Sequence, residues 1–407
     1  MRFTTKAGTV AAVAAAGLVM TACGTPGGGG ADPSKAIKAS AVPAKPSKAV
    51  TLNILDVAGN KQLTESIFSS FVKDHPDVIS KVTWQTAGAP DMAGKVKAQQ
   101  DAGNLHIDLV LTGTDGLSAG IGQGLFVNMK KFSGRLSNMA NYQTPAANMQ
   151  KLAQDQAVEL VYYPSGPLLE YNPDKVKNPP KTATELLAWA KAHPGKFGYA
   201  QPANSGPGRT WLMGLPYILK DKDPKDPVNG WPKTWKYLRE IGKYVKTYPT
   251  GTSVTMNNLK TGAWDMALTT TGWDINPRAL NQVPKNFKVT SLAGFKWVSD
   301  AQYAAVPKGV STDKMSAILQ VLNYALEKKQ QAKTFDDGYF YPGPAVKGVT
   351  IDMAPAKSRQ VMKEYGRPEY DDLIKSNPVV TPIDAKKLVK AFSMWDQKVG
   401  GGKAESQ

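Results

Sequence analysis

The segment from residue 50 to residue 111 alternates between two hydrophobic periods, and this alternation constrains the fold more than any other feature. Some stretches repeat apolar residues at every second position, as strands do, and others repeat them at helical spacing. The predicted order is strand, helix, strand, helix, strand, over residues 50–57, 63–72, 82–86, 91–102 and 106–111. Such an order predicts an α/β fold with parallel strands.

Two loops follow predicted strand ends in this segment. In open parallel sheets, ligands bind beyond the carboxyl ends of the strands. One loop offers Gly59 and Asn60, and the other offers Thr114 and Asp115. Glycine allows the backbone to approach a ligand, while the polar side chains form hydrogen bonds. The same residue types are common in ordinary turns, so both interpretations stay open.

Three later passages add candidates. Residues 158–176 contain two strand-like runs around a Pro-Ser-Gly-Pro turn, which suits a chain that passes between lobes. A glycine-rich loop at 202–209 precedes a predicted helix, and Arg209 there is either an anion-binding donor or a solvated side chain. A hydroxyl-rich loop with an aromatic residue follows a predicted strand at 266–268.

The N-terminus has the features of a secretory signal. Arg2 and Lys6 precede an uncharged apolar run at 7–20, which is too short to span a bilayer as a helix. Small residues then lead to Cys23, the one cysteine of the chain. This arrangement resembles a bacterial lipobox, in which the cysteine carries a fatty acyl group such as palmitate. We therefore expect a lipoprotein signal peptide at 1–22, with a plain signal peptide as the alternative.

Residues 23–50 are rich in Gly, Pro, Ser, Ala and Lys, and we expect a disordered tether there. The formal net charge of the chain is +17. The basic residues are mostly lysines scattered among acids, which is typical of a solvated surface, so we expect no nucleic-acid partner. A weak attraction to anionic lipid or cell-wall polymer suits the charge better. No cofactor or metal is expected.

Four passages carry a resemblance to a known family. They are LEYNPDKVKNPPKTATELLAWAKAHPGKFGYAQP, GAWDMALTTTGWD, AAVPKGVSTDKMSAILQVLNYALEKKQQAK and YFYPGPAVKG. In these passages the chain resembles the type II periplasmic solute-binding proteins of ABC importers, and more narrowly the YnjB-like subgroup. The resemblance covers roughly residues 51–398.

The resemblance implies two α/β lobes with central sheets, flanking helices and a ligand cleft between the lobes. The implied division is 51–163 plus 300–345 for lobe 1, 164–299 for lobe 2, and 346–400 for a C-terminal helical region that packs on the lobes. Hinge motion closes such lobes on a ligand. With Arg209, the ligand-binding residues expected at the cleft are Gly59, Asn60, Thr114, Asp115, Tyr163, Ser165, Asn204, Ser205, Gly206, Thr271, Gly272, Trp273 and Tyr339.

The family further implies a lipid-anchored protein on the outer face of the cell membrane, or in the periplasm. It acts as a monomer that is not an enzyme, and its partners are a small-molecule solute and an ABC permease. Asp115 suits an amine and Arg209 a carboxylate or phosphate, so the charge of the ligand stays open.

Three other functions are compatible with parts of the sequence. A tethered hydrolase, such as a glycosidase, remains compatible with the many carboxylates, although the histidines His75, His106 and His193 lie in no nucleophile-elbow setting. A ferric-binding protein needs several tyrosines facing the cleft, whereas adjacent residues on a strand point to opposite faces. A cell-wall-binding scaffold explains the charge but not the two-lobe pattern.

Overall fold

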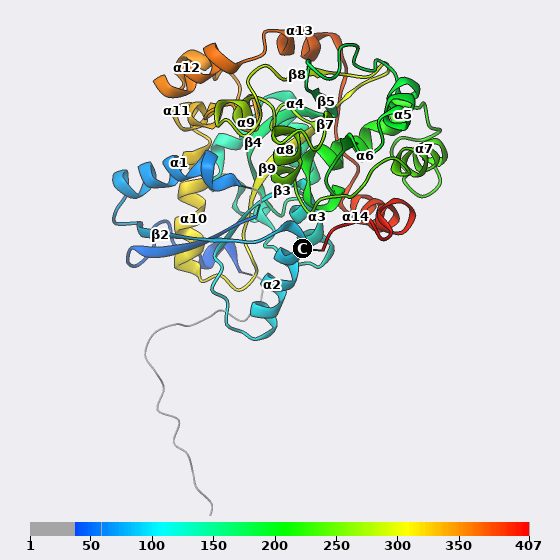
Figure 1. Ribbon diagram of the computed structural model, residues 1–407. Coiled ribbons are helices and arrows are strands. Elements are labelled where there is room, and N and C mark those ends of the chain that lie inside the picture. The colour runs from blue at the N-terminus through cyan, green and yellow to red at the C-terminus, as the bar shows by residue number, and fades with distance from the viewer. Residues whose placement is uncertain (1–36, 58, 407) are drawn as a thin grey trace, which may run out of the picture.

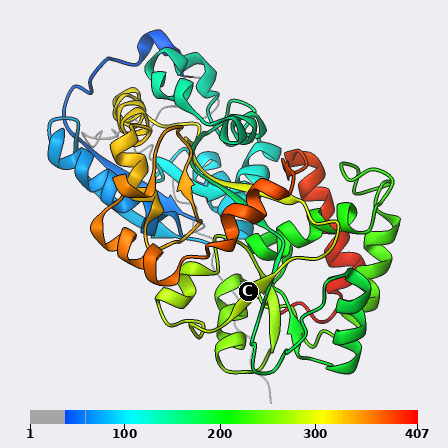
Figure 2. The same cartoon turned by 90° about the horizontal axis from the view of Figure 1, so that it is seen from above.

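The computed structural model describes residues 37–57 and 59–406 and divides them into two lobes, each built around its own β-sheet (Figure 1). Figure 2 shows the lobes side by side, with the blue, cyan and yellow segments in one and most of the green segments in the other. The expected two-lobed α/β fold is confirmed. No helix of the described residues is both long enough and apolar enough to cross a membrane.

The sheet of the first lobe has seven strands in the order β10-β4-β9-β3-β1-β2, with β11 paired to β9. β1 pairs in parallel with both β2 and β3, whereas β9 is antiparallel to β3 and to β4. The strands are β1 (Val50–Asp56), β2 (Ile79–Thr86), β3 (Leu109–Gly113), β4 (Val158–Gly166), β9 (Trp297–Ala305), β10 (Gly343–Pro344) and β11 (Val379–Val380). The parallel β1–β2–β3 unit is the one that the hydrophobic periods predict.

Helices cover both faces of this sheet. α1 buries Leu63, Ile67 and Phe68 along one stripe, as the helical spacing predicts. The first-lobe helices are α1 (Asn60–Asp74), α2 (Ala89–Asp101), α3 (Thr114–Gly122), α4 (Thr144–Leu152), α10 (Thr312–Ala325) and α11 (Lys328–Gln331). Short 3-10 helices are η1 (Ala39–Ala41), η2 (Met129–Arg135), η3 (Ser137–Asn141), η5 (Ala332–Phe335) and η6 (Ile351–Met353).

The second lobe is built on a four-stranded sheet in the order β6-β7-β5-β8. Its strands are β5 (Leu168–Tyr171), β6 (Phe197–Gly198), β7 (Met266–Thr269) and β8 (Lys288–Thr290). Its helices are α5 (Ala183–Ala192), η4 (Pro202–Asn204), α6 (Gly206–Ile218), α7 (Pro232–Gly242), α8 (Thr252–Lys260) and α9 (Ile275–Ala279). The Thr182 hydroxyl accepts from the Glu185 amide and caps the start of α5.

Two long strands connect the lobes. β4 ends at Gly166 in the first sheet, and β5 begins at Leu168 in the second. β9 returns the chain, and all nine of its residues are buried. Val298 near its start packs in the core of the second lobe, whereas Tyr303 near its end packs in the core of the first. A change in the angle between the lobes therefore has to be absorbed where these strands leave each sheet, and in the later segment that leads from η6 to the C-terminal helices.

The C-terminal region contributes α12 (Ala356–Tyr365), α13 (Glu369–Ser376), α14 (Ala385–Trp395) and the π-helical turn η7 (Asp396–Gly400). Leu388, Phe392 and Trp395 of α14 belong to the core of the second lobe. The stripe that these residues form in the sequence is thus a packing surface, as expected of an amphipathic helix.

Residues 37–49 differ from the expected tether, because they lie against the first lobe. Val42 and Pro46 are buried. The Arg135 guanidinium donates to the carbonyl oxygens of Pro43 at 2.9 Å and Ala44 at 3.0 Å. These contacts offset the conformational entropy that the segment loses when it becomes ordered. The rest of the expected tether, the signal peptide and Cys23 lie outside the described residues.

Candidate functional site

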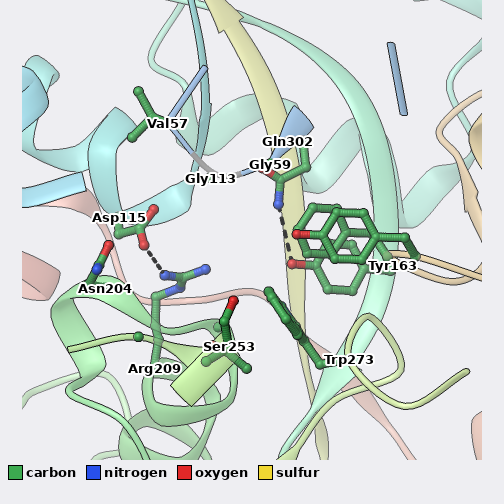
Figure 3. Close-up of a pocket in the computed structure, with 15 residues that line it drawn as sticks. Val57, Gly59, Gly113, Asp115, Tyr163, Asn204, Arg209, Ser253, Trp273 and Gln302 are labelled. Atoms are coloured by element: carbon green, nitrogen blue, oxygen red, sulfur yellow. Dashed lines mark hydrogen bonds and ion pairs between the residues drawn. The ribbon is translucent and has the colours of Figure 1, made fainter. Parts of the chain in front are cut away.

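A cavity of about 260 Å³ lies between the two lobes (Figure 3). It opens at the carboxyl ends of β1 and β3, where the topology of a parallel sheet places ligand sites. The first lobe supplies Val57, Gly59, Gly113, Asp115, Tyr163, Gln302, Tyr339 and Phe340. The second lobe supplies Asn204, Gly206, Arg209, Gly251, Thr252, Ser253 and Trp273.

Gly59 holds the turn between β1 and α1 at the edge of the cavity. Its φ of 73° is in the left-handed region that favours glycine. A Cβ atom there would lie 2.7 Å from the Tyr339 hydroxyl oxygen. A side chain at position 59 would thus be strained and would displace a ring that borders the cavity.

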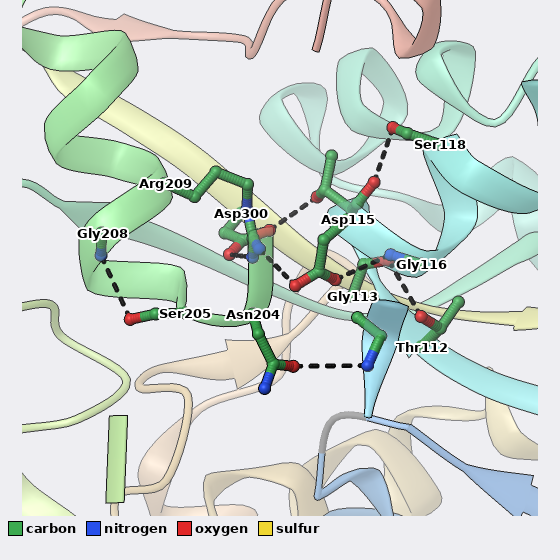
Figure 4. A network of polar contacts seen from close by, with 12 residues as sticks. Thr112, Gly113, Asp115, Gly116, Ser118, Asn204, Ser205, Gly208, Arg209 and Asp300 are labelled. Atoms are coloured by element: carbon green, nitrogen blue, oxygen red, sulfur yellow. Dashed lines mark hydrogen bonds and ion pairs between the residues drawn. The ribbon is translucent and has the colours of Figure 1, made fainter. Parts of the chain in front are cut away.

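Arg209 is the centre of a polar network that joins the lobes (Figure 4). It lies in the first turn of α6, and its guanidinium donates to Asp115 Oδ2 at 2.6 Å and to Asp300 Oδ2 at 2.5 Å. All three side chains are at least nine-tenths buried. Burial lowers the pKa of Arg209, but the two carboxylates more than offset this and raise it. The arginine therefore stays charged and neutralises one of its two partners.

Asp300 accepts hydrogen bonds from three further groups besides Arg209. Its Oδ1 accepts from the Thr114 hydroxyl at 2.6 Å and the Ala301 amide at 3.0 Å, and its Oδ2 accepts from the Tyr163 hydroxyl at 2.9 Å. Burial and then the charge of Asp300 raise the pKa of Tyr163, so its hydroxyl keeps the proton that it donates. Asp300 is therefore a buried anchor behind the cavity wall.

A second chain of hydrogen bonds fixes the back of the cavity. Gln302 donates from Nε2 to the Tyr163 hydroxyl at 3.3 Å and accepts at Oε1 from Asn60 Nδ2 at 3.0 Å. The Asp56 carboxylate in turn accepts from the Asn60 amide at 2.8 Å, at the start of α1. These contacts hold Tyr163 in one orientation before any ligand arrives, which lowers the entropic cost of binding.

Aromatic rings, including that of Tyr163, form another wall of the cavity. Phe340 stacks between Tyr163, at a centroid distance of 4.9 Å, and Tyr339, at 4.0 Å. Trp273 meets Tyr339 edge to face at 5.4 Å. Gly272 makes this arrangement fit, since a Cβ there would lie 2.6 Å from the Phe340 ring. The wall offers a ligand apolar area and π faces.

Asn204 makes a second contact between the lobes. Its Oδ1 accepts from the Ala89 amide of α2 at 3.3 Å, and its Nδ2 donates to the Thr250 carbonyl at 2.9 Å. Beside it, α8 begins after Gly251, which has no side-chain cap. Gly251, Thr252 and Ser253 at this helix start line the cavity.

Most of the predicted ligand-binding residues meet at the cavity, although they come from separate parts of the sequence. The structure brings together Gly59, Asp115, Tyr163, Asn204, Gly206, Arg209, Trp273 and Tyr339. It places Asn60, Thr114, Ser165, Ser205, Thr271 and Gly272 behind the lining. Whether the first set binds a ligand stays a prediction.

The residues behind the lining support it. Asn60 and Thr114 hold Gln302 and Asp300, as described above. Ser205 caps α6 through the Gly208 amide at 3.2 Å. The Thr271 amide donates to the Ser165 carbonyl at 2.9 Å, beside the crossing from β4 to β5. The expected loop at 202–209 is therefore shorter than predicted, because residues 206–209 already form the first turn of α6.

Sequence reasoning missed several residues of the cavity. Asp300 and Gln302 lie in the buried strand β9, where polar side chains among Val298, Ala301 and Ala304 are a signal of function rather than of packing. Other missed residues are Gly251, Thr252, Ser253 and Phe340. Val57 and Gly113 belong to the two loops that follow predicted strands, beside the expected residues Gly59 and Thr114.

The described residues hold no cluster of three or more His, Cys, Asp or Glu side chains that suits a metal ion. No histidine is among the described residues that line the cavity. His193 stacks on Trp189 at 4.5 Å and His75 lies against Phe71 at 4.6 Å. The arrangement at the cavity therefore offers charge pairs, aromatic faces and backbone amides for binding.

The sequence matches the family model of the bacterial extracellular solute-binding proteins over residues 66–361. A search of curated proteins found no match. Solved structures with the same fold include an ABC transporter from Clostridium perfringens, with 15% identity and a TM-score of 0.62 over 86% of this chain and 98% of that one.

Two further structures resemble the chain to a similar degree. One is the periplasmic binding protein AfuA from Actinobacillus pleuropneumoniae with fructose-6-phosphate bound, at 13% identity and a TM-score of 0.61 over 86% of this chain and 99% of that one. The other is a periplasmic thiamin binding protein, at 15% identity and a TM-score of 0.60 over 88% of this chain and 99% of that one. At these identities the likeness shows the fold and not the ligand.

Proposed function

Because the chain belongs to the family of bacterial extracellular solute-binding proteins, we propose that it captures a small molecule between its lobes and delivers it to the permease of an ABC importer. The observation that supports this most directly is the cavity itself. It is lined from both lobes, at the carboxyl ends of β1 and β3, and Arg209 of the second lobe meets Asp115 of the first across it.

In this proposal, binding exchanges solvent for hydrogen bonds and ring contacts. Tyr163 is fixed in advance by Asp300 and Gln302, so its orientation costs little on binding. Closure brings Arg209 and Asn204 against the first lobe, at Asp115 and α2. The permease then binds the closed arrangement of the lobes in preference to the open one.

We further propose that residues 1–22 are a lipoprotein signal peptide and that acylated Cys23 anchors the chain on the outer face of the cell membrane. The protein then works as a monomer that binds without chemistry, as a YnjB-like member of the family. The positions of His75 and His193 outside the cavity favour binding over hydrolysis.

A fluorescence titration tests the proposed function. Trp273 borders the cavity, whereas Trp189 stacks on His193 at a remote site. A ligand that enters the cavity is expected to change the tryptophan emission of the wild type and of Trp189→Phe, and to leave Trp273→Phe with a much smaller change. A full response in Trp273→Phe would place binding elsewhere and contradict the proposal.

A further inference from the structure

The ionised side chains at the cavity carry more negative than positive charge. Arg209 is the one basic side chain among the described residues that line it. It pairs with two carboxylates, Asp115 and Asp300, so the three groups together keep one negative charge. Asp56 adds a carboxylate nearby, at the start of α1. The field in the cavity therefore favours a cation.

Arg209 is already paired with two carboxylates. Its two terminal nitrogens donate to Asp115 and Asp300, and its buried Nε has no hydrogen-bond partner among the described residues. An anion that displaces either carboxylate leaves a buried acid without its partner, which is strongly unfavourable, and an anion that approaches the remaining N–H groups meets the net negative charge of the three side chains.

Asp115 differs from Asp300 in that it retains room for another donor. Its Oδ1 accepts from the Gly116 amide at 2.9 Å, and its carboxylate borders the cavity. A Cβ on Gly113 would lie 2.9 Å from this oxygen, so glycine at position 113 keeps the approach open. Because Asp115 lies at the cavity surface, a ligand reaches it without disturbing Asp300.

The partial positive charge at the N-terminal ends of the helices around the cavity does not cancel this net negative charge. The amides of Asn60 and Lys61 in α1 donate to Asp56. Asp115 lies in the first turn of α3, and Ser205 caps α6. Among the described residues no side chain caps the start of α8, and Gly251, Thr252 and Ser253 at this helix start line the cavity.

Trp273 completes the site on the aromatic wall. It is partly exposed and borders the cavity, whereas Phe340 is buried and stacks on Tyr163 and Tyr339. An indole face attracts a desolvated cation, and a carboxylate opposite it adds directional hydrogen bonds.

Building on the proposed function, we infer that the cleft selects a compact organic cation, with Asp115 as its anionic partner and Trp273 as its aromatic partner. The volume of about 260 Å³ sets the scale, which suits a molecule of small-metabolite size. Arg209 then acts as a fixed neighbour that holds Asp115 in place, and not as a ligand for an anion.

Calorimetric titration of the full chain tests this inference with probes of each charge. The cations are choline, putrescine and thiamine, the anions are citrate and glucose 6-phosphate, and maltose is neutral. At least one cation is expected to bind at one site. Asp115→Asn is expected to weaken that binding at least tenfold, while Asp101→Asn, at an exposed carboxylate of α2, changes it less than twofold.

Gly113→Ala keeps every charge and tests the same geometry if Asp115→Asn fails to fold. The methyl group crowds Asp115 Oδ1, so we expect cation binding to weaken at least tenfold. Gly134→Ala, at a position with no heavy atom within 4 Å of the added Cβ, is its matched control. Equal binding by both glycine variants would overturn the role of Asp115.

The outcomes separate the two proposals. Binding of an anion or of maltose, with no cation bound, overturns the charge class and leaves the solute-binding function intact. If no probe binds and small-angle scattering shows no closure of the lobes, both the solute-binding function and the charge class are overturned.

Discussion

Buried acidic side chains in this protein fall into two groups, according to whether a cation reaches them. Asp115 and Asp300 share Arg209, whereas Glu159 on β4 is fully buried and neither of its carboxylate oxygens has a hydrogen-bond partner among the described residues. Burial and then the charge of Asp300 raise the pKa of Glu159 well above its ordinary value. Glu159 therefore stays protonated in the folded state where an exposed glutamate is ionised.

This difference predicts a pH-dependent effect of Glu159→Gln. The unfolded-state pKa of glutamate is about 4.3, so the stability that the protonated side chain contributes is fully present below that pH and is lost as the pH rises toward the raised folded-state pKa. Glutamine does not titrate. Urea unfolding is expected to show a stabilising gain that is small at pH 4.5 and grows by up to about 1.4 kcal/mol per pH unit above it.

The control for this prediction is Glu65→Gln, because Glu65 is exposed on α1. It is expected to change the free energy of unfolding little at either pH. A gain from Glu159→Gln that is the same at pH 4.5 and pH 8 would show that the side chain does not titrate as described.

At the scale of elements, helix and strand interiors were predictable from the sequence and several boundaries at the site were not. The stripe of α1 and the alternation of β1 mark buried faces directly. The residues Gly206-Pro207-Gly208 suggest a loop, yet they form the first turn of α6. Proline is compatible with a first turn. Gly208 is required by tertiary contact, since a Cβ there would lie 2.3 Å from the Ala200 carbonyl oxygen.

In the segment 37–49, too, tertiary contacts override the structure that the local sequence predicts. Its composition is that of a tether, and the groups that order it are distant in the sequence: Arg135 is about 90 residues away, and Gln320 also donates to the Ala44 carbonyl oxygen. Such long-range contacts leave no trace in local patterns. Polar residues within a buried strand, such as Asp300 and Gln302, are the local signal that would have revealed more of the site.

Arg135→Ala is expected to release this segment. Hydrogen bonds from a charged group contribute roughly 1.5–3 kcal/mol, so amide hydrogen exchange at residues 39–44 is expected to accelerate roughly tenfold or more. Arg239→Ala, on the exposed face of α7, serves as the control and is expected to leave exchange in this segment unchanged. Unchanged protection in Arg135→Ala would show that other contacts hold the segment.

At the scale of the whole molecule, the order of elements predicts the α/β class, and the family resemblance implies the two lobes, which the crossing at residues 158–176 suits. The cavity did not follow residue by residue, because its lining comes from both lobes and from segments as far apart as Gly59 and Phe340. The strand ends that the sequence predicts as ligand sites do border the cavity. The pairing of Arg209 with Asp115 depends on how the lobes meet, which no single segment encodes.

Closure of the lobes around the cavity is tested most directly by a distance between them. Spin labels at Lys73→Cys on α1 and Lys236→Cys on α7, in a Cys23→Ala background, report that distance by pulsed electron paramagnetic resonance. We predict two distances without ligand and the shorter one alone with ligand, while Arg209→Ala without ligand favours the longer one. A single distance that stays the same in all three samples would contradict a solute-binding cleft that closes between the lobes.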